Sequence, residues 1–293
     1  MSECMLCPRE CRADREGGAL GFCGVGSKIK IARAAPHFWE EPIISGSRGS
    51  GTVFFSGCSL RCVFCQNKKI SHGTLGREID EAELERIIFG LCDEGVHNIN
   101  FVTPTHYADK IARLLEKIKP SLPVPVVWNT SGYEKAQTLD MLDGLVDIYL
   151  PDFKYFDPEL GKKYSAAPDY QEVASAAIER MFSQVGKCRL GEDGLLKKGM
   201  IVRHLVLPGC RKDSIRAVEH LADILPTDGV YLSIMSQYTP EFAMDCEFSN
   251  LRRRVTSFEY ESVLRRADEL GFIGFSQERS AATSDFTPEF YGE

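Results

Sequence analysis

The stretch that decides the fold reads Gly57-Cys58-Ser59-Leu60-Arg61-Cys62-Val63-Phe64-Cys65-Gln66-Asn67, and it spaces three cysteines as C-x3-C-x2-C. Three thiolates this close together can hold three irons of a 4Fe-4S cube, which leaves the fourth iron open to a small molecule. The run follows Thr52-Val53-Phe54-Phe55-Ser56, whose β-branched and aromatic residues predict a strand that ends at Gly57. We therefore expect a cluster in the loop at the carboxyl end of a strand, where the active sites of α/β barrels lie.

Cys58, Cys62 and Cys65, with the aromatic Phe64 before the last cysteine, resemble the signature of the radical S-adenosylmethionine (SAM) superfamily. The resemblance implies that the methionyl amine and carboxylate of SAM chelate the open iron and that an electron from the cluster cleaves the sulfonium. It also implies that a 5'-deoxyadenosyl radical abstracts a hydrogen atom from the substrate, and that Phe64 and Asn67 lie beside SAM. The alternative from the residues alone is a structural zinc site, which needs a fourth ligand such as His72.

The amino-acid composition limits which kinds of molecule the protein can bind. The chain has 293 residues, of which 43% are hydrophobic, so it can bury a full core as one large α/β domain. A formal charge of -7 and a pI near 5.5 argue against nucleic acid as the partner. No apolar stretch is as long as a bilayer is thick, and the start Met1-Ser2-Glu3-Cys4 is neither a basic nor an apolar leader. We expect no membrane partner and a cytoplasmic location.

A second group of cysteines, Cys4, Cys7, Cys11 and Cys23, is spaced C-x2-C-x3-C-x11-C in a glycine-rich segment. Four thiolates complete the coordination of zinc or of a second 4Fe-4S cluster, and the spacing does not separate the two. Unliganded surface thiols at this density would be open to oxidation, which disfavours them. Because so short a segment cannot bury a core alone, we expect residues 1–50 to form a small metal-binding extension and residues 51–293 to form the main domain.

Strand patterns and helix patterns alternate along the rest of the chain. Further strands are expected at 98–103, 124–129, 145–150, 201–207 and 230–235. Helices are expected from the cap at Asp80 to Gly95, over 108–119, 134–142, 170–185 and 213–225, and from the cap at Thr256 to Gly271. This alternation predicts a parallel sheet with helices outside, and the radical SAM resemblance implies a partial (β/α)6 TIM-like barrel. Residues 187–199 lack periodicity and are expected to form a surface insertion or a loop.

Polar residues follow the ends of the expected strands, where a site would gather them. The second strand ends at Thr103, Thr105 and His106, where activating enzymes related to pyruvate formate-lyase activating enzyme carry a Gly-Gly-Glu type motif that holds the methionyl amine. The third ends at Asn129-Thr130-Ser131-Gly132, which is similar to the Asp-Thr-Asn-Gly segment beside SAM in that family. The resemblance implies that these residues contact SAM, with Asn129 in place of an aspartate.

The next two strand ends carry charged residues. Pro151-Asp152-Phe153-Lys154 is similar to the Leu-Asp-Leu-Lys of the same family, and the Asp and Lys, two residues apart, point to one face. The resemblance implies that Lys154 neutralises the SAM carboxylate. The run 202–209 resembles the family's Ile-Arg-Tyr-Val-Val-Val-Pro-Gly and aligns Arg203 with its arginine and His204 with its tyrosine.

One acidic pair precedes the first barrel strand. Glu40 and Glu41 are candidate acid and base groups, but adjacent residues on an extended chain point opposite ways. We therefore expect them to have a solvated or a loop role.

The resemblance to glycyl-radical-enzyme activases extends from about Gly51 to Gly271, and with the four-cysteine motif the chain looks most like an uncharacterised branch of these enzymes. It implies an electron from a reduced flavodoxin or ferredoxin type carrier and a protein substrate, a glycyl radical enzyme. Two alternatives stay open. One is radical SAM modification of a peptide or small molecule, and the other is a non-catalytic scaffold in which the same cysteines hold zinc.

Overall fold

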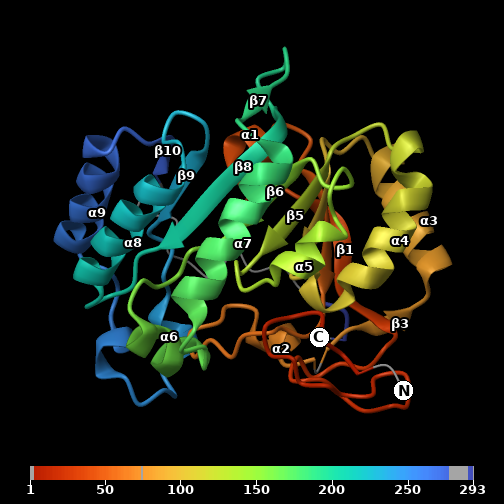
Figure 1. Cartoon of the computed structure of the whole chain (residues 1–293), viewed down its shortest axis with the longest axis horizontal. Helices are drawn as coiled ribbons and strands as arrows, with labels where there is room; N and C mark the ends of the chain where they lie inside the picture. Colours follow the sequence, from red (N-terminus) through yellow and green to blue (C-terminus); the bar gives the residue numbers. More distant parts are fainter. Residues whose placement is uncertain (1–2, 74, 277–289, 293) are drawn as a thin grey trace.

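Parallel strands form the centre of the fold. In the computed structural model, which describes residues 3–73, 75–276 and 290–292, seven of them lie in the order β10-β9-β8-β6-β5-β4-β2 (Figure 1). They are β2 (Ser50–Phe55), β4 (Ile99–Val102), β5 (Val126–Thr130), β6 (Ile148–Pro151), β8 (Leu196–Leu205), β9 (Tyr231–Met235) and β10 (Ile273–Ser276). Two antiparallel strands, β1 (Ile29–His37) and β3 (Arg77–Ile79), extend the sheet beyond β2. The α/β architecture and the open, partial barrel are as expected.

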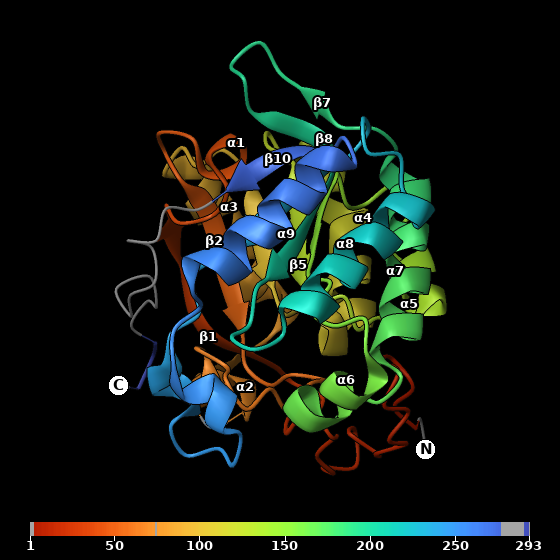
Figure 2. The same cartoon turned by 90° about the vertical axis from the view of Figure 1, so that its left-hand side faces the viewer.

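Helices cover the outer face of this sheet (Figures 1 and 2). They are α3 (Glu81–Asp93), α4 (Ala108–Ile118), α5 (Ala136–Asp140), α7 (Tyr170–Val185), α8 (Arg211–Ile224) and α9 (Ser257–Glu269). The expected caps are present: the Asp80 carboxylate accepts from the Glu83 N–H at 2.7 Å, and Thr256 and Glu259 form a reciprocal capping box. None of the helices in the described ranges combines the length and apolar character needed to span a bilayer.

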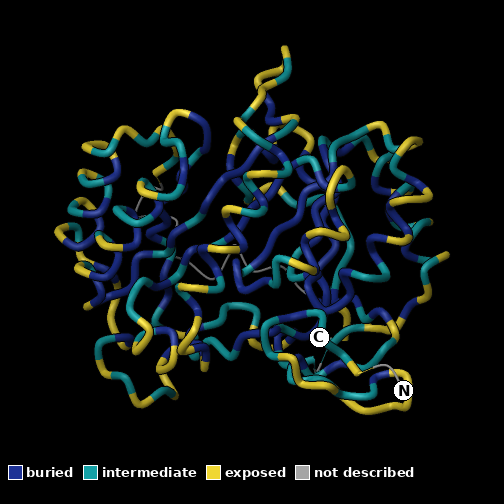
Figure 3. The backbone as a smooth tube through the Cα atoms, in the orientation of Figure 1, coloured by how far each residue is buried: buried dark blue, intermediate teal, exposed yellow. Residues whose placement is uncertain are grey.

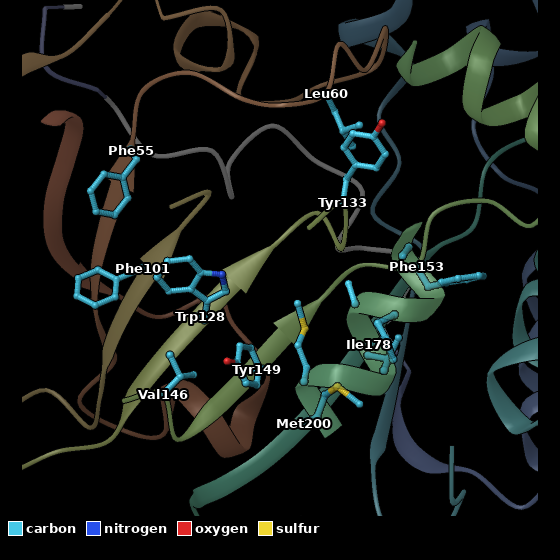
Figure 4. Close-up of a cluster of buried hydrophobic side chains, with 14 of the residues drawn as sticks. Phe55, Leu60, Phe101, Trp128, Tyr133, Val146, Tyr149, Phe153, Ile178 and Met200 are labelled. Carbon is cyan, nitrogen blue, oxygen red and sulfur yellow. The ribbon is translucent and has the colours of Figure 1, made fainter. Parts of the chain in front are cut away.

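Side chains alternate between two environments along the strands. On β5, Trp128 packs into the main core together with Ile178 of α7, whereas Val127 packs with Ile44 of α1 (Pro42–Ser45). Figure 4 shows Trp128 among the buried side chains of the main core. The short α1 therefore fills the interior of the barrel, and its Ile44 carbonyl accepts from the side chain of Asn98, just before β4.

Three local expectations are corrected. The segment 187–199 is not a plain loop, because β7 (Arg189–Leu190) pairs with the start of β8 in a hairpin whose turn carries Gly194 at φ +73°. The helix expected over 134–142 is limited to α5. The strand β10 was not expected, because most of its residues are exposed and it carries little apolar pattern.

The carboxyl ends of the parallel strands lie under a cover of short segments. The loop after β2, α2 (Lys68–Ser71), α6 (Pro158–Ser165) and the N-terminal segment lie at this end of the barrel, opposite α1 and the β7 hairpin (Figures 1 and 2). Figure 3 shows buried strands, with exposed residues along the outer helices and the N-terminal segment. A site at the carboxyl ends of the strands would therefore lie beneath these short segments.

Candidate functional site

The three cysteines of the C-x3-C-x2-C motif lie in the loop 56–67 between β2 and α2, called the cluster loop below. Main-chain hydrogen bonds fix this loop to its neighbours: the Cys58 N–H donates to the Cys23 carbonyl at 3.3 Å, and the Val63 N–H donates to the Tyr164 carbonyl at 2.9 Å. Gly57 has φ +90°, and a Cβ there would lie 2.8 Å from the Cys23 carbonyl oxygen. Only glycine fits where the loop leaves the strand.

The thiols of the cluster loop are close together and surrounded by protein. Burial, with repulsion from the Cys62 thiolate, raises the pKa of Cys58 to about 12 and that of Cys65 to about 11. Within the described ranges no three Cys, His, Asp or Glu side chains are arranged as metal ligands. The donor set nevertheless fits a cluster, because a cationic iron centre would relieve both the burial and the repulsion of three thiolates. The Leu60 N–H already donates to the Cys58 sulfur at 3.4 Å.

A line of charged side chains leads from the cluster loop into the barrel. The Lys154 ammonium donates to Asp152 at 2.6 Å, and the other oxygen of Asp152 accepts from Arg203 Nε at 3.0 Å. Burial would raise the pKa of Asp152, but these two cations hold it below its ordinary value. Burial would likewise lower the pKa of Lys154, but Asp152 and then the Cys62 thiolate raise it. Lys154 therefore stays charged and lies near the cluster loop.

Arg203 and Lys154 differ in how many of their N–H donors remain available to a ligand. The guanidinium of Arg203 also donates to Glu40 at 3.2 Å and to Asn129 Oδ1 at 2.6 Å, so its donors are directed at protein groups. The ammonium of Lys154 has three N–H groups and one is bound to Asp152, which leaves two for a ligand. Lys154 is thus the cation of this line that can bind a carboxylate, while Arg203 holds Asp152 and Asn129 in place.

Glu40 and Glu41 lie in the loop before α1, as expected, but the expectation that they are solvated was wrong. The Glu40 carboxylate is buried and accepts from the side chains of Asn100 at 3.0 Å and Asn129 at 3.1 Å as well as from Arg203. Glu41 is 9% exposed, and its Oε2 has no hydrogen-bond partner. Burial raises the pKa of both carboxyl groups. The chain turns into α1 at this point instead of continuing extended, so both side chains enter the barrel.

Two of the expected SAM contacts are bound to a carboxylate that sequence reasoning missed. Thr105 and Thr130 donate to Glu134 Oε1 at 2.7 and 2.5 Å, and Trp128 Nε1 lies 3.2 Å from the same atom. Glu134 is 2% exposed, and burial raises its pKa although these hydrogen bonds oppose the shift. The sequence signal that could have pointed to Glu134 is its position directly after the motif Asn-Thr-Ser-Gly-Tyr. The hydrogen bonds to Glu134 order the carboxyl ends of β4 and β5.

The two histidines named from the sequence are buried and neutral. His106 Nε2 donates to the Ser56 carbonyl at 2.8 Å, and His204 Nδ1 donates to the Phe153 carbonyl at 2.6 Å. Burial lowers the pKa of His106 to about 3 and that of His204 to about 4. Among the residues that the structure describes, the second ring nitrogen of each has no hydrogen-bond partner. Each histidine therefore braces a strand end next to the site.

Two further expected residues, Phe64 and Asn67, belong to the cluster loop, and a third, Thr103, follows β4. Phe64 is 7% exposed and packs edge-on against Tyr238, with ring centroids 6.1 Å apart. Asn67 precedes α2 and accepts from the Ile70 N–H at 3.0 Å. Thr103 has φ +57°, a strained backbone for a β-branched residue, and it directly follows β4. Figure 4 shows Leu60, from the cluster loop, pointing toward Tyr133, and both belong to the main core.

Comparisons with known proteins bear on the family and the fold. A family model described as Radical SAM superfamily matches residues 52–184. An uncharacterised protein of Methanocaldococcus jannaschii is 30% identical over 279 residues, which cover 91% of this chain and 74% of that protein. The anaerobic ribonucleoside-triphosphate reductase-activating protein of Escherichia coli is 26% identical over 137 residues, which cover 42% of this chain and 88% of that protein. A solved radical SAM methyltransferase from Sphaerobacter thermophilus has a TM-score of 0.51 at 15% identity, covering 77% of this chain and 65% of that one.

Proposed function

The chain belongs to the radical SAM superfamily, and we propose that it is an activating enzyme that abstracts a hydrogen atom from a glycine of a partner protein. Membership of the superfamily implies a 4Fe-4S cluster and SAM. In this chain Cys58, Cys62 and Cys65 are the residues that would hold the cluster, since they lie together at the carboxyl end of β2.

One observation carries the proposal. The Lys154 ammonium is bound to Asp152 and lies close enough to Cys62 for that thiolate to raise its pKa, and among the described residues two of its donors stay free, as a group that binds a carboxylate beside an open iron needs. The similarity to an activating protein of Escherichia coli, over 42% of this chain, supports the choice of a protein substrate.

The residues of this chain have separate tasks in the proposed reaction. When bound, the cluster and SAM supply the reductive cleavage of a sulfonium and a radical that abstracts hydrogen. The three thiolates hold the cluster, and Lys154 binds the methionyl carboxylate. Asp152 orients Lys154, and Arg203 fixes Asp152 through the hydrogen bond of 3.0 Å. Phe64 and Tyr238 keep water from the space beside the cluster loop.

The proposal includes partners and a location. A reduced flavodoxin or ferredoxin type carrier would supply the electron, and the protein substrate would be a glycyl radical enzyme. We infer that the protein acts in the cytoplasm, since cysteine-rich cluster sites require reducing conditions. The competing function within the superfamily is modification of a peptide or a small molecule by the same chemistry.

The substrate class can be tested by isotope transfer. Cells that express the protein are grown on dideuterated glycine, and their soluble proteins are separated from small molecules by filtration. Each fraction is incubated with reduced protein and SAM, and the 5'-deoxyadenosine is analysed by mass spectrometry, with Cys62→Ala as the inactive control. Deuterium transferred from the protein fraction, with a doublet signal in electron paramagnetic resonance (EPR), is expected. Transfer from the small-molecule fraction alone would contradict the activase proposal.

A further inference from the structure

We propose that Cys4, Cys7, Cys11 and Cys23 hold one metal centre, a zinc ion or a second 4Fe-4S cluster, and that this centre positions the cluster loop through Arg9. The inference rests on the proposed function only in that the cluster loop carries the catalytic cluster. The role assigned to the N-terminal centre is mechanical and involves no electron transfer.

The segments that carry the four N-terminal cysteines are held side by side. Arg15 donates to the Cys4 sulfur at 3.7 Å and to the Gly26 carbonyl at 2.9 Å, and the Cys4 N–H donates to the Ala13 carbonyl at 3.1 Å. The sulfurs of Cys23 and Cys11 lie 3.1 and 3.5 Å from the point where a Cβ of Gly21 would lie, so the site has no room for a side chain there. Cys7 and Cys23 are 7% and 5% exposed. Four thiols gathered in this way complete the coordination of one metal centre.

Arg9, between Cys7 and Cys11, reaches from this centre to the cluster loop. Its guanidinium donates to the carbonyls of Ser59 at 2.8 Å, Ala166 at 2.5 Å and Ser165 at 3.3 Å. Ser59 directly follows Cys58, and the Ser165 hydroxyl lies 3.0 Å from the Cys62 sulfur. One side chain therefore holds the carbonyl that follows Cys58 and the end of α6, whose Ser165 hydroxyl contacts Cys62.

A second connection runs through Cys23 itself. Its carbonyl accepts from the Cys58 N–H at 3.3 Å, and the preceding carbonyl of Phe22 accepts from Arg61 at 2.5 Å. Residues 3–28 contain no helix or strand, so regular secondary structure does not hold these groups in place. A metal bound by four thiolates supplies the missing rigidity, because its binding free energy becomes folding free energy for such a segment.

The metal centre is tested by metal analysis of anaerobically purified protein. The variant Cys7→Ser/Cys11→Ser is compared with wild type and with the matched control Cys188→Ser, and zinc and iron are counted per chain. The double variant is expected to lose about one zinc or about four irons, and this choice identifies the centre. The control is expected to match wild type. An unchanged metal content in the double variant would overturn the proposal.

The positioning role is tested by hydrogen exchange of the amides in residues 57–66, which needs neither SAM nor turnover. Arg9→Ala is expected to keep the N-terminal metal and to exchange these amides about tenfold faster, because the Ser59 carbonyl beside Cys58 and the carbonyls of Ser165 and Ala166 lose their donor. Arg9→Lys should recover part of the protection, and the exposed-residue control Arg12→Ala should exchange as wild type does. The EPR signal of the reduced cluster should change in Arg9→Ala only. Unchanged exchange and an unchanged signal in Arg9→Ala would refute positioning, whether or not the protein cleaves SAM.

Discussion

Arg203 Nη1 lies 3.2 Å from Glu40 Oε2, and the two side chains are 15% and 9% exposed. The pair joins residues that are 163 positions apart and ties the segment before α1 to β8 inside the barrel. The remaining donors of Arg203 reach Asp152 and Asn129. The ion pair with Glu40 therefore fixes Arg203, which holds Asp152, which in turn binds Lys154.

The first prediction follows from the burial of this pair. Replacing one partner leaves an uncompensated charge in the barrel, so Arg203→Met is expected to lower the free energy of unfolding by about 3 to 5 kcal/mol. The double variant Glu40→Gln/Arg203→Met removes both charges and should be more stable than Arg203→Met alone. Urea unfolding of the three proteins measures the difference. Equal losses in the single and double variants would show that the pair does not interact.

The second prediction concerns Lys154. Lys154→Ala removes a charge-assisted donor, so the dissociation constant for SAM should rise about 10 to 100-fold while the iron content is unchanged. The matched control is Lys197→Ala, a lysine of the β7–β8 hairpin that pairs with Asp193 at the opposite end of the barrel. Equilibrium dialysis with SAM and iron analysis test both. A loss of iron in Lys154→Ala would make Lys154 a structural residue instead of a SAM ligand.

The third prediction concerns the turn after β5. Gly132 has φ +77°, and a Cβ there would lie 2.2 Å from the Asp152 carbonyl oxygen, so Gly132→Ala should destabilise by about 3 kcal/mol or more. Gly95 has a similar φ of +82° with nothing within 4 Å, and Gly95→Ala should cost only about 1 kcal/mol of backbone strain. Thermal unfolding separates the two contributions. Equal losses would mean that the close approach of β6 is not required.

The fourth prediction is a dependence of stability on pH. The folded-state pKa values of His106 and His204, about 3 and about 4, lie below the ordinary value of 6.5, so the unfolded chain binds more protons below pH 6.5. Stability should therefore be greatest above pH 6.5 and decrease as the pH falls toward 4, by about 1.4 kcal/mol per histidine at pH 5.5. His204→Asn should unfold more easily at pH 7.5 but lose less between pH 7.5 and 5.5. A variant with the wild-type slope would show that His204 is not buried in its neutral form.

The fold and the cluster loop could be predicted because their signals are local. The strand before Gly57, the cysteine spacing and the caps at Asp80 and Thr256 each lie within a few residues of one another. The turn into α1 has no such signal, since Pro42 follows two glutamates that an extended chain would leave in solvent. Burial of Glu40 depends on Arg203, which comes near only when the strands have assembled into the sheet.

The contacts within the site were harder to predict for a similar reason. Lys154 and Asp152 are neighbours in sequence, so their common face follows from the two-residue repeat of a strand. Thr105 and Thr130 end two different strands, and their shared acceptor Glu134 lies beyond the second. A hydroxyl at a strand end can bind a ligand or a carboxylate, and the sequence does not show which of them is in reach.

The central claim is that Cys58, Cys62 and Cys65 hold the cluster at which SAM is cleaved. The most direct measurement is the formation of 5'-deoxyadenosine and methionine from SAM by anaerobic protein reduced with dithionite. Wild type should form both products in equal amounts, and the variant with all three cysteines replaced by Ala should form neither, while Cys188→Ala should match wild type. Equal product formation by the triple variant and wild type would contradict the account.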